Sequence, residues 1–538
     1  MIILNKINGD LFYIIILPTI IFLAICFSFI ASNINQFELN IQSLILMFVI
    51  FESAILFLYL FVKWLNLNVH LLRCLSFFLV IFFLLQWYFN SIHFFIKLYI
   101  GGSHKYVLLF FFLLSSALLS VTAKNNVVYR LFVNFCLIFF VLNFSKLAFA
   151  VFTKPDKLDI NSQAIANQLP YQEHSSQQLK NIYYFVTDEL GTEKGLRQAN
   201  VDTTFIHELK KELTESGFTV LEKNFSSYNL TYLSIQSIFN MDYPVDEQSS
   251  RYNSTNIFYS NSLKQHTESL LEKQLKTLGY EKFVYFGNEF HSCNALRKNI
   301  VCGSGVEKSF IKNVLTDYTL NMFIETSLFK SIVGRLAMLY GVGRFDTLDY
   351  VSEYLRLHKK NVRPQFLFAH VIMPHSPFRT QTCERDERYQ TTGVVNKLLY
   401  FNLTKKMYSN SIKCLTKQLL PILKFISKQD PDAIIIVQGD HGSGFYYEAE
   451  NAWNSDNQAS KIALNERFSG FNAIKMPSSC VVNLPVSLGN VNTIRLALAC
   501  AAGIKPKLLE EKHFIAHFET HHDFGKVYRY TTQEALNS

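Results

Sequence analysis

Residues 433–444 read AIIIVQGDHGSG, an apolar run that ends with Asp440 and His441 set between glycines. An uninterrupted apolar run of this length predicts a strand buried on both faces, which is typical of a parallel sheet covered by helices. An acidic side chain beside a neutral imidazole suits a divalent cation such as zinc or manganese. The alternative is a turn, in which aspartate and glycine follow the strand and the histidine caps it. The stretch therefore predicts a buried strand that ends in a metal site or in a turn.

Short apolar runs alternate with helical patterns from residue 181 onward. Strands are predicted at residues 182–186, 218–221, 282–286, 366–372 and 433–437, and helices at 205–216, 231–239, 262–278 and 408–427. This order predicts an α/β domain with a mostly parallel central sheet. In such sheets the ligand site lies beyond the carboxyl ends of the strands, where residues distant in sequence meet. The side chains expected to gather there are Asp188, His370, His375, Asp440 and His441.

The first 152 residues have a different composition. The chain of 538 residues is 49% hydrophobic and only 17% charged, which is too apolar for an ordinary soluble protein of this size. The apolar excess lies in five runs, at residues 11–31, 41–62, 71–89, 106–121 and 131–151. Such runs predict an N-terminal bundle of about five transmembrane helices. The sequence thus divides into a transmembrane domain (1–152), a polar linker (153–180) and an outer domain (181–538).

Charged residues in the short loops orient these spans. One side has Lys6, Lys63, Arg73, Lys124 and Arg130, and the other has only Lys97 and Lys105. The positive-inside rule then places the N-terminus in the cytoplasm and, after five crossings, residues 181–538 outside. The net charge of +9 is spread along the chain without a basic, aromatic-rich cluster. It indicates attraction to anionic lipid rather than nucleic-acid binding.

Cysteine usage agrees with an external domain. Three of the nine cysteines lie in the predicted spans, and the other six lie beyond them without a Cys-x-x-Cys pair. This pattern is compatible with disulfides in an oxidising compartment, and Cys293–Cys302 is the simplest pair.

Asp188 and Thr231 each have a structural and a chemical interpretation. Asp188 follows the strand at 182–186, where a carboxylate is either a metal ligand or the N-cap of the next helix. Thr231 begins the helix at 231–239 after the hydroxyl-rich stretch SSYNL. A hydroxyl at that position either caps the helix or faces an anion bound at the helix N-terminus, where it can attack a phosphoryl group.

Five motifs occur in one order: NIYYFVTDE (181–189), SYNLTYLSIQSIFNMDY (227–243), FLFAHVIMPHSPF (366–378), IIIVQGDHG (434–442) and ERFSGFNAI (466–474). This ordered set resembles the alkaline phosphatase and sulfatase superfamily. It is most similar to the membrane-anchored branch, which includes lipoteichoic acid synthases and lipid A phosphoethanolamine transferases.

The resemblance implies a role for each matched residue. One catalytic divalent metal (zinc, manganese or magnesium) would be bound by Asp188, Thr231, Asp440 and His441. Thr231 would also be the nucleophile that becomes phosphorylated. His370 and His375 would hold the phosphoryl oxygens or protonate the leaving group, or else serve only as structural histidines. Arg467 would bind the phosphate.

The resemblance also implies a bacterial enzyme of the cytoplasmic (inner) membrane, with a periplasmic catalytic domain. It would move phosphoethanolamine or phosphoglycerol from a phospholipid to a cell-envelope glycan or lipid. The alternatives are a phosphodiesterase or atypical sulfatase, and a catalytically inactive envelope protein. The Cys/Ser-x-Pro-x-Arg motif of common sulfatases is absent, which disfavours ordinary sulfate ester hydrolysis.

A histidine cluster near the C-terminus offers a second candidate metal site. His513, His517 and His521, followed by His522, have the i, i+4 and i+8 spacing of one helix face. No motif of the resemblance covers them, and we favour a solvated surface over a metal site.

Overall fold

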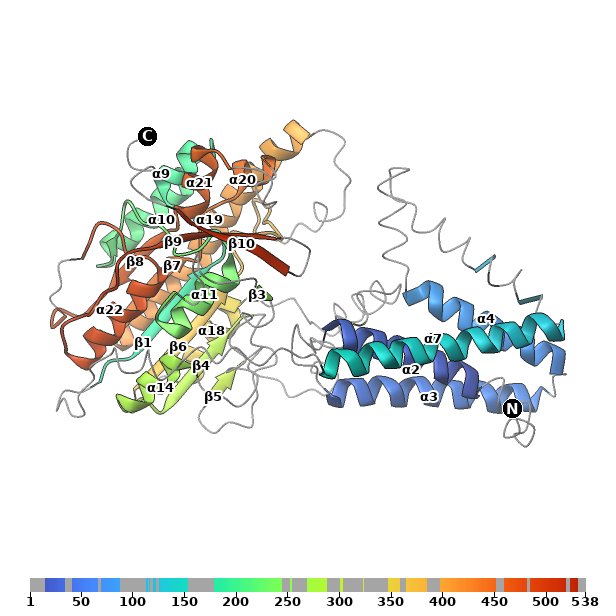
Figure 1. Cartoon of the computed structure of the whole chain (residues 1–538). Helices are drawn as coiled ribbons and strands as arrows, with labels where there is room; N and C mark the ends of the chain where they lie inside the picture. The colour runs from blue at the N-terminus through green and yellow to red at the C-terminus, as the bar shows by residue number, and fades with distance from the viewer. Residues whose placement is uncertain are drawn as a thin grey trace. The chain divides into compact units, whose positions relative to one another are not determined.

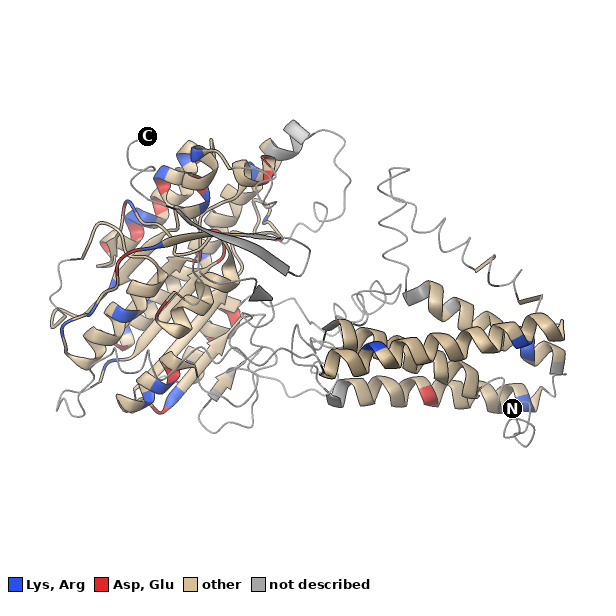
Figure 2. Ribbon diagram, in the orientation of Figure 1, with Lys and Arg blue, Asp and Glu red and all other residues tan. Residues whose placement is uncertain are grey.

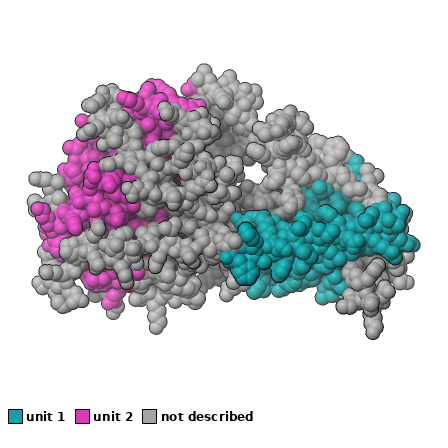
Figure 3. All heavy atoms as spheres, viewed as in Figure 1, with its two compact units in different colours: residues 1–156, 308–344 teal, residues 157–307, 345–538 magenta. Residues whose placement is uncertain are grey.

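The computed structural model describes residues 15–33, 41–65, 69–87, 113–114, 116, 120–121, 125–152, 179–243, 252–253, 269–287, 300–302, 323, 347–358, 364–384, 397–450, 459–480, 484–518 and 523–530. The chain divides into two compact units (Figure 3), residues 1–156 with 308–344 and residues 157–307 with 345–538. The predicted linker lies almost wholly outside the described residues, so the predicted domain boundaries stay predictions.

The first unit contains four apolar helices among its described residues. They are α2 (Leu17–Asn33), α3 (Ile41–Trp64), α4 (Val69–Trp87) and α7 (Asn126–Phe152), drawn in blue to cyan in Figure 1. Each overlaps a predicted span, whereas most of the predicted span at 106–121 lies outside the described residues. Among the described residues, the helices at Leu44–Trp64 and Asn126–Phe152 are the two that are long and apolar enough to cross a membrane. The count of five spans is therefore not confirmed.

Few charged side chains occur on these helices, as Figure 2 shows. One of them, Glu52 of α3, accepts a hydrogen bond of 2.8 Å from the hydroxyl of Thr19 on α2. Phe323, from the second segment of the unit, packs its ring against Phe22 and Phe29, with centroids 6.2 and 5.2 Å apart. Packing of apolar and aromatic side chains thus connects distant segments within this unit.

A mixed sheet forms the centre of the second unit. Within the described residues its strands run in the order β2 (Thr219–Val220), β8 (Asn472–Lys475), β7 (Ile434–Gly439), β1 (Ile182–Thr187), β6 (Gln365–Val371), β4 (Lys282–Phe286) and β5 (Ile300–Cys302). The strands from β7 to β5 pair in parallel, and β8 and β2 add antiparallel pairs at one edge. The predicted α/β domain with a mostly parallel sheet is confirmed in this form.

Helices cover both faces of this sheet (Figure 1). One apolar core joins the sheet to α10 (Thr204–Glu215), α18 (Thr347–Leu357) and α19 (Lys397–Gln429), and the other joins it to α11 (Thr231–Asn240), α14 (Leu270–Thr277) and α22 (Asn490–Ala502). Strand β1 shows the alternation: Tyr183 and Phe185 enter the first core, whereas Tyr184 and Val186 enter the second. Because successive side chains point to opposite faces, a strand covered on both sides must be apolar throughout.

A smaller sheet contains β3 (Tyr252–Asn253), β10 (Asp523–Tyr530) and β9 (His513–Phe518). The prediction that His513, His517 and His521 share a helix face is wrong, because residues 513–518 form a strand. His513 is also not solvated; it is buried, and its Nδ1 lies 2.7 Å from the carbonyl oxygen of Ser226. Phe514 and Ala516 are both buried and lie two residues apart, which is the spacing of one face of a strand. The prediction followed the four-residue spacing of the histidines instead.

Two disulfides join described cysteines, Cys383 to Cys414 and Cys480 to Cys500. The predicted pair Cys293–Cys302 lies outside the residues whose side chains are described.

Candidate active site at the carboxyl ends of the strands

The register of the parallel strands brings three predicted site residues together. His370 of β6 pairs with Val186 of β1, and Thr187 of β1 pairs with Gly439 of β7. Asp188 and Asp440, which follow those strands, therefore end beside each other. His370 projects from the same face as Phe366 and Phe368, toward the core that contains α11. All three polar side chains are buried.

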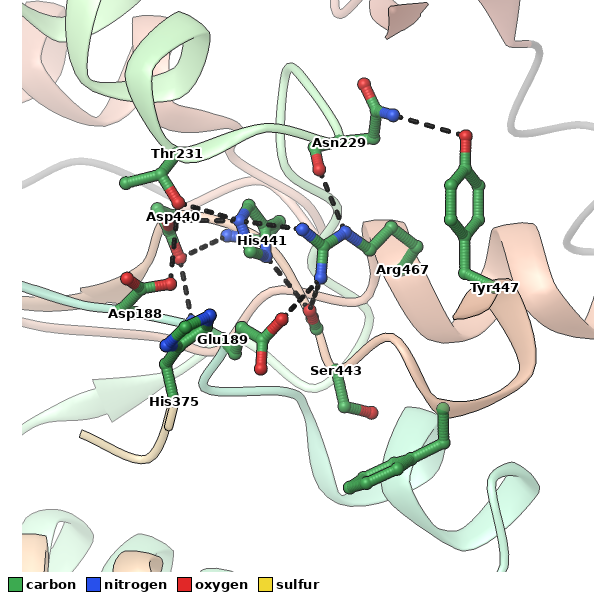
Figure 4. A network of polar contacts seen from close by, with 12 residues as sticks. Asp188, Glu189, Asn229, Thr231, His375, Asp440, His441, Ser443, Tyr447 and Arg467 are labelled. Atoms are coloured by element: carbon green, nitrogen blue, oxygen red, sulfur yellow. Dashed lines mark hydrogen bonds and ion pairs between the residues drawn. The ribbon is translucent and has the colours of Figure 1, made fainter. Parts of the chain in front are cut away.

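Thr231 lies at the start of α11 and faces this group. The N-cap residue of α11 is Leu230, so the hydroxyl of Thr231 does not serve as the helix cap. Its Oγ1 lies 3.1 Å from Nε2 of His441 and 3.4 Å from Oδ1 of Asp188 (Figure 4). The structure thus brings the predicted nucleophile to the predicted ligands.

Asp188 is also free of the capping role that the sequence allowed. The next helix, α9 (Glu193–Gln198), is capped by Thr192, whose hydroxyl accepts from the amide of Gly195. The backbone turns sharply after Asp188, because Glu189 has a φ of 66°, in the left-handed region. This turn lets the Glu189 amide donate to Oδ1 of Asp440 at 2.9 Å.

The donor set fits a divalent cation. Among the described residues, Asp188, His370 and Asp440 each offer a ligand atom, and these atoms all lie within 4.8 Å of one another. The two buried carboxylates repel each other when both are ionised, and a cation between them would remove that cost. Burial, followed by the charge of Asp188, raises the pKa of Asp440 to about 7. Oxygen and nitrogen ligands of this kind suit zinc or manganese.

This set shares Asp188 and Asp440 with the predicted one, but it contains His370 and does not contain Thr231 or His441. The resemblance assigned His370 to the phosphoryl group, and the structure places its Nε2 3.8 Å from Oδ2 of Asp188. The register of β6 against β1 accounts for this position, and a single sequence does not specify that register.

His441 is held in one tautomer. Its Nδ1 lies 3.0 Å from the carbonyl oxygen of Gly442, so Nδ1 carries the proton and Nε2 presents a lone pair. Burial, followed by the charge of Arg467, holds the pKa of His441 well below its usual value. The imidazole is therefore neutral, and Nε2 points to Thr231 and lies 3.2 Å from Oδ2 of Asp440. A lone pair so placed serves either as a metal ligand or as a base.

His375 has the opposite character. Burial alone would lower its pKa, but the nearby carboxylates of Asp188 and Glu189 raise it to about 9. Its amide donates to the carbonyl oxygen of Asp188 at 3.2 Å, which fixes the loop beside the site. At neutral pH the imidazole of His375 is positively charged, as a proton donor requires.

Arg467, at the end of α21 (Lys461–Phe468), is almost fully buried and bonded on three sides. Its Nε donates to the carbonyl oxygen of Asn229 at 2.8 Å, and one terminal nitrogen contacts Oε1 of Glu189 at 2.7 Å. The other terminal nitrogen lies 3.1 Å from Nε2 of His441. The predicted phosphate-binding role of Arg467 stays a prediction. Its contacts with Glu189 and Asn229 were not predicted from the sequence.

Two glycines make this close packing possible. A Cβ on Gly442 would lie 2.1 Å from the carbonyl oxygen of Glu466, and one on Gly444 would lie 2.9 Å from Arg467. Glu466 in turn accepts hydrogen bonds from Ser443 and from the amides that begin α20 (Phe445–Ala449). The glycines that flank the Asp-His pair in the sequence thus admit α21 and its arginine.

The Sulfatase family model matches residues 180–468, more than half of the chain. The protein belongs to the sulfatase family. This confirms the predicted kinship with the alkaline phosphatase and sulfatase superfamily. No curated protein matches the chain.

Solved structures that are similar to this chain include a bacterial periplasmic domain and a bacterial lipoteichoic acid synthase. The C-terminal periplasmic domain of EptC from Escherichia coli is 11% identical with a TM-score of 0.39, and the match covers 67% of this chain and 94% of that one. The same domain in complex with zinc is also 11% identical with a TM-score of 0.39, and the match covers 66% of this chain and 94% of that one. The lipoteichoic acid synthase LtaP from Listeria monocytogenes is 12% identical with a TM-score of 0.36, and the match covers 66% of this chain and 83% of that one.

Sequence reasoning missed Asn229 in this sulfatase-family site and considered Glu189 only as a replacement for Asp188. Both act through backbone groups as well as side chains, since the Glu189 amide and the Asn229 carbonyl each make a contact described above. Glu189 had a signal in its position beside Asp188, but an extended backbone would have pointed it away from the site. The left-handed turn at Glu189 is what changes that direction.

Proposed function

We propose that the protein is a membrane-bound transferase that moves a phosphorylated head group, phosphoethanolamine or phosphoglycerol, from a phospholipid to a glycan or lipid of the bacterial cell envelope. The single observation that carries this proposal is the position of Thr231. Its hydroxyl lies at a helix start, within 3.4 Å of both a neutral imidazole and a buried carboxylate. That arrangement is typical of an activated nucleophile.

The residues divide the first half-reaction between them. Oγ1 of Thr231 attacks phosphorus, and its proton passes to a group that it already faces, Nε2 of His441 or Oδ1 of Asp188. The bond from phosphorus to the glycerol oxygen of the lipid breaks, and protonated His375 supplies the proton that diacylglycerol takes away. The products are diacylglycerol and a phosphothreonine that carries the head group.

The second half-reaction runs in reverse on a different hydroxyl. An acceptor hydroxyl attacks the phosphothreonine, its proton returns to His375, and the Thr231 oxygen leaves with the proton that it first gave up. Water in place of the acceptor would make the protein a phosphodiesterase. A bound divalent cation, held by Asp188, His370 and Asp440 with Thr231 and His441 at its edge, would supply charge neutralisation for the phosphoryl oxygens.

The apolar helices support a lipid donor. Residues 44–64 and 126–152 are long and apolar enough to span a bilayer, and a donor in the same membrane is held near the enzyme. We propose a multi-pass protein of the inner membrane with its catalytic unit on the periplasmic side.

A mass measurement tests the proposal. The detergent-purified full-length protein is loaded with zinc and incubated with phosphatidylethanolamine or, separately, phosphatidylglycerol, and the peptide that contains Thr231 is weighed. A head-group phosphate adduct that is absent from Thr231→Ala would establish the covalent step and identify the donor. An unmodified peptide with both lipids, in protein shown to contain zinc, would reject transfer from these donors.

A further inference from the structure

The loop that leads to Thr231 is bonded along its length to strand β9. His513 Nδ1 donates to the carbonyl oxygen of Ser226 at 2.7 Å, and the Phe514 amide donates to the carbonyl oxygen of Ser227 at 2.9 Å. The rings of Tyr228 and Phe514 stack with centroids 5.5 Å apart. Strand β9 lies beyond residue 468, where the family match ends. A segment outside the matched part of the chain therefore contacts every residue from 226 to 228.

Asn229 completes this contact with its side chain. Its Nδ2 donates to the carbonyl oxygen of Ala516 at 3.0 Å, and its Oδ1 accepts from the amide of Ala516 at 2.9 Å. The side-chain amide thus pairs with β9 as a neighbouring strand would. The same Nδ2 donates to the hydroxyl of Tyr447 at 3.2 Å (Figure 4). Asn229 is fully buried, so these bonds are not exchanged with water.

The backbone of Asn229 reaches the other side of the site. Its carbonyl oxygen accepts from Nε of Arg467, and the terminal nitrogen of that arginine contacts Nε2 of His441. Thr231 is two residues further along the chain and faces the same Nε2. A shift of Asn229 would therefore move both the nucleophile and the group that orients the imidazole.

We propose that β9 is a structural part of the active site and that Asn229 is a positioning residue, which acts on Thr231 through the chain and on His441 through Arg467. This inference rests on the proposed function for its kinetic consequence. Loss of the hydrogen bonds between the Asn229 side chain and Ala516 should lower the rate of the covalent step and leave lipid binding unchanged. Small displacements of a reacting group lower rates by about tenfold to a hundredfold.

Asn492 of α22 offers a matched control. It makes the same pair of bonds to a backbone, because its Nδ2 donates to the carbonyl oxygen of Leu509 and its Oδ1 accepts from the Leu509 amide, both at 2.8 Å. It is equally buried. Within the described part of the chain, its side chain bonds to Leu509 and Glu511 and not to the candidate metal ligands. Truncating either asparagine removes two side-chain hydrogen bonds to one backbone residue, so the two variants should lose a similar free energy of unfolding.

The experiment compares Asn229→Ala with Asn492→Ala in the full-length, zinc-loaded protein. The rate of adduct formation on Thr231 is measured over a range of phospholipid concentrations, and the zinc affinity by competition with a chelating dye. We expect Asn229→Ala to lower the maximal rate by about tenfold or more, with little change in the lipid concentration at half-maximal rate, and to weaken zinc binding several-fold. Asn492→Ala should stay within about twofold of the wild type in both.

Each outcome decides the matter. Equal losses in the two variants, or a loss only in lipid affinity, would overturn the positioning role. If the wild type forms no adduct, the proposed function fails, and the zinc affinities alone test the positioning role. Weaker zinc binding by Asn229→Ala than by Asn492→Ala supports that role, and equal zinc affinity of the two variants rejects it. Should the alanine variants not fold, the isosteric pair Asn229→Asp and Asn492→Asp repeats the comparison; each replaces the Nδ2 donor by a carboxyl oxygen and adds one buried acidic group.

Discussion

Asp188→Asn should be more stable than the wild type without metal and less stable than the wild type in zinc. In the metal-free protein, burial and the charge of Asp188 raise the pKa of Asp440 from 3.8 to about 7. Each unit of pKa corresponds to about 1.4 kcal/mol, so ionised Asp440 lowers the free energy of unfolding by roughly 4 kcal/mol. A carboxyl with a raised pKa contributes its stability at low pH and loses it as the pH rises through the folded value. The metal-free wild type should therefore lose stability between about pH 4 and pH 7.

The substitution removes only part of this cost. Asp188 is the second cause of the shift after burial, so Asp188→Asn should restore part of this free energy to the metal-free protein above pH 7. Zinc acts in the other direction on the wild type, where a concentration 100 times the dissociation constant stabilises by about 2.7 kcal/mol. The variant lacks a ligand and should gain little. It should thus be the more stable protein in chelator and the less stable one in zinc.

Thermal unfolding at pH 8, in chelator and in excess zinc, measures both differences. Asp430→Asn is the matched control, because the pKa of Asp430 is also raised by burial but its carboxylate accepts from Asn181, at the opposite end of the sheet. Its response to zinc should equal that of the wild type. The reasoning is refuted if Asp188→Asn is less stable than the wild type in chelator, or if zinc stabilises both proteins equally.

Three further predictions concern the proton donor, the glycines and a disulfide. His375→Gln should slow transfer from phospholipid by about 10²-fold yet spare the initial release of p-nitrophenolate from a p-nitrophenyl phosphodiester, because that leaving group needs no proton; equal losses in both measurements would exclude the donor role. Gly442→Ala should abolish expression of folded protein, since its Cβ would lie 2.1 Å from a backbone oxygen, whereas Gly191→Ala, whose closest contact would be a leucine side chain at 3.1 Å, should still fold. Reduction of Cys383–Cys414, which closes a sequence separation of 31, should lower the free energy of unfolding by about 3–4 kcal/mol in a denaturant titration, and no shift would contradict this.

The elements that the sequence predicted well are those set by local burial. Strand β4 was predicted at the residues that form it, because a short apolar run between a lysine and a glycine defines both ends of the strand. Helix α19 begins at Lys397, eleven residues before its predicted start at Tyr408. The first turns of that helix, KLLYFNLTKK, are also apolar, so the predicted start was placed too late.

The site was predictable where strand ends supply its residues and not where pairing over a long range supplies them. Asp188, Asp440 and His441 follow buried strands, so topology alone gathers them. The contact of Asn229 with Ala516 spans 287 residues, and nothing in either local sequence specifies it. The count of five spans is not confirmed for a different reason, since hydropathy identifies apolar helices but does not by itself establish that each one crosses the bilayer.

The unfavourable free energy of the backbone and charges around Glu189 supports a chemical role for this site. Glu189 occupies a left-handed backbone conformation, which costs a non-glycine residue roughly 1–3 kcal/mol. The same residue forms a buried ion pair with Arg467, and such pairs seldom stabilise a fold more than apolar side chains would. Two unfavourable features therefore fall on one residue, beside two buried carboxylates that repel each other. The doubly covered sheet offsets them, and the reaction proposed for Thr231 would need such fixed charges, which an apolar core would not provide.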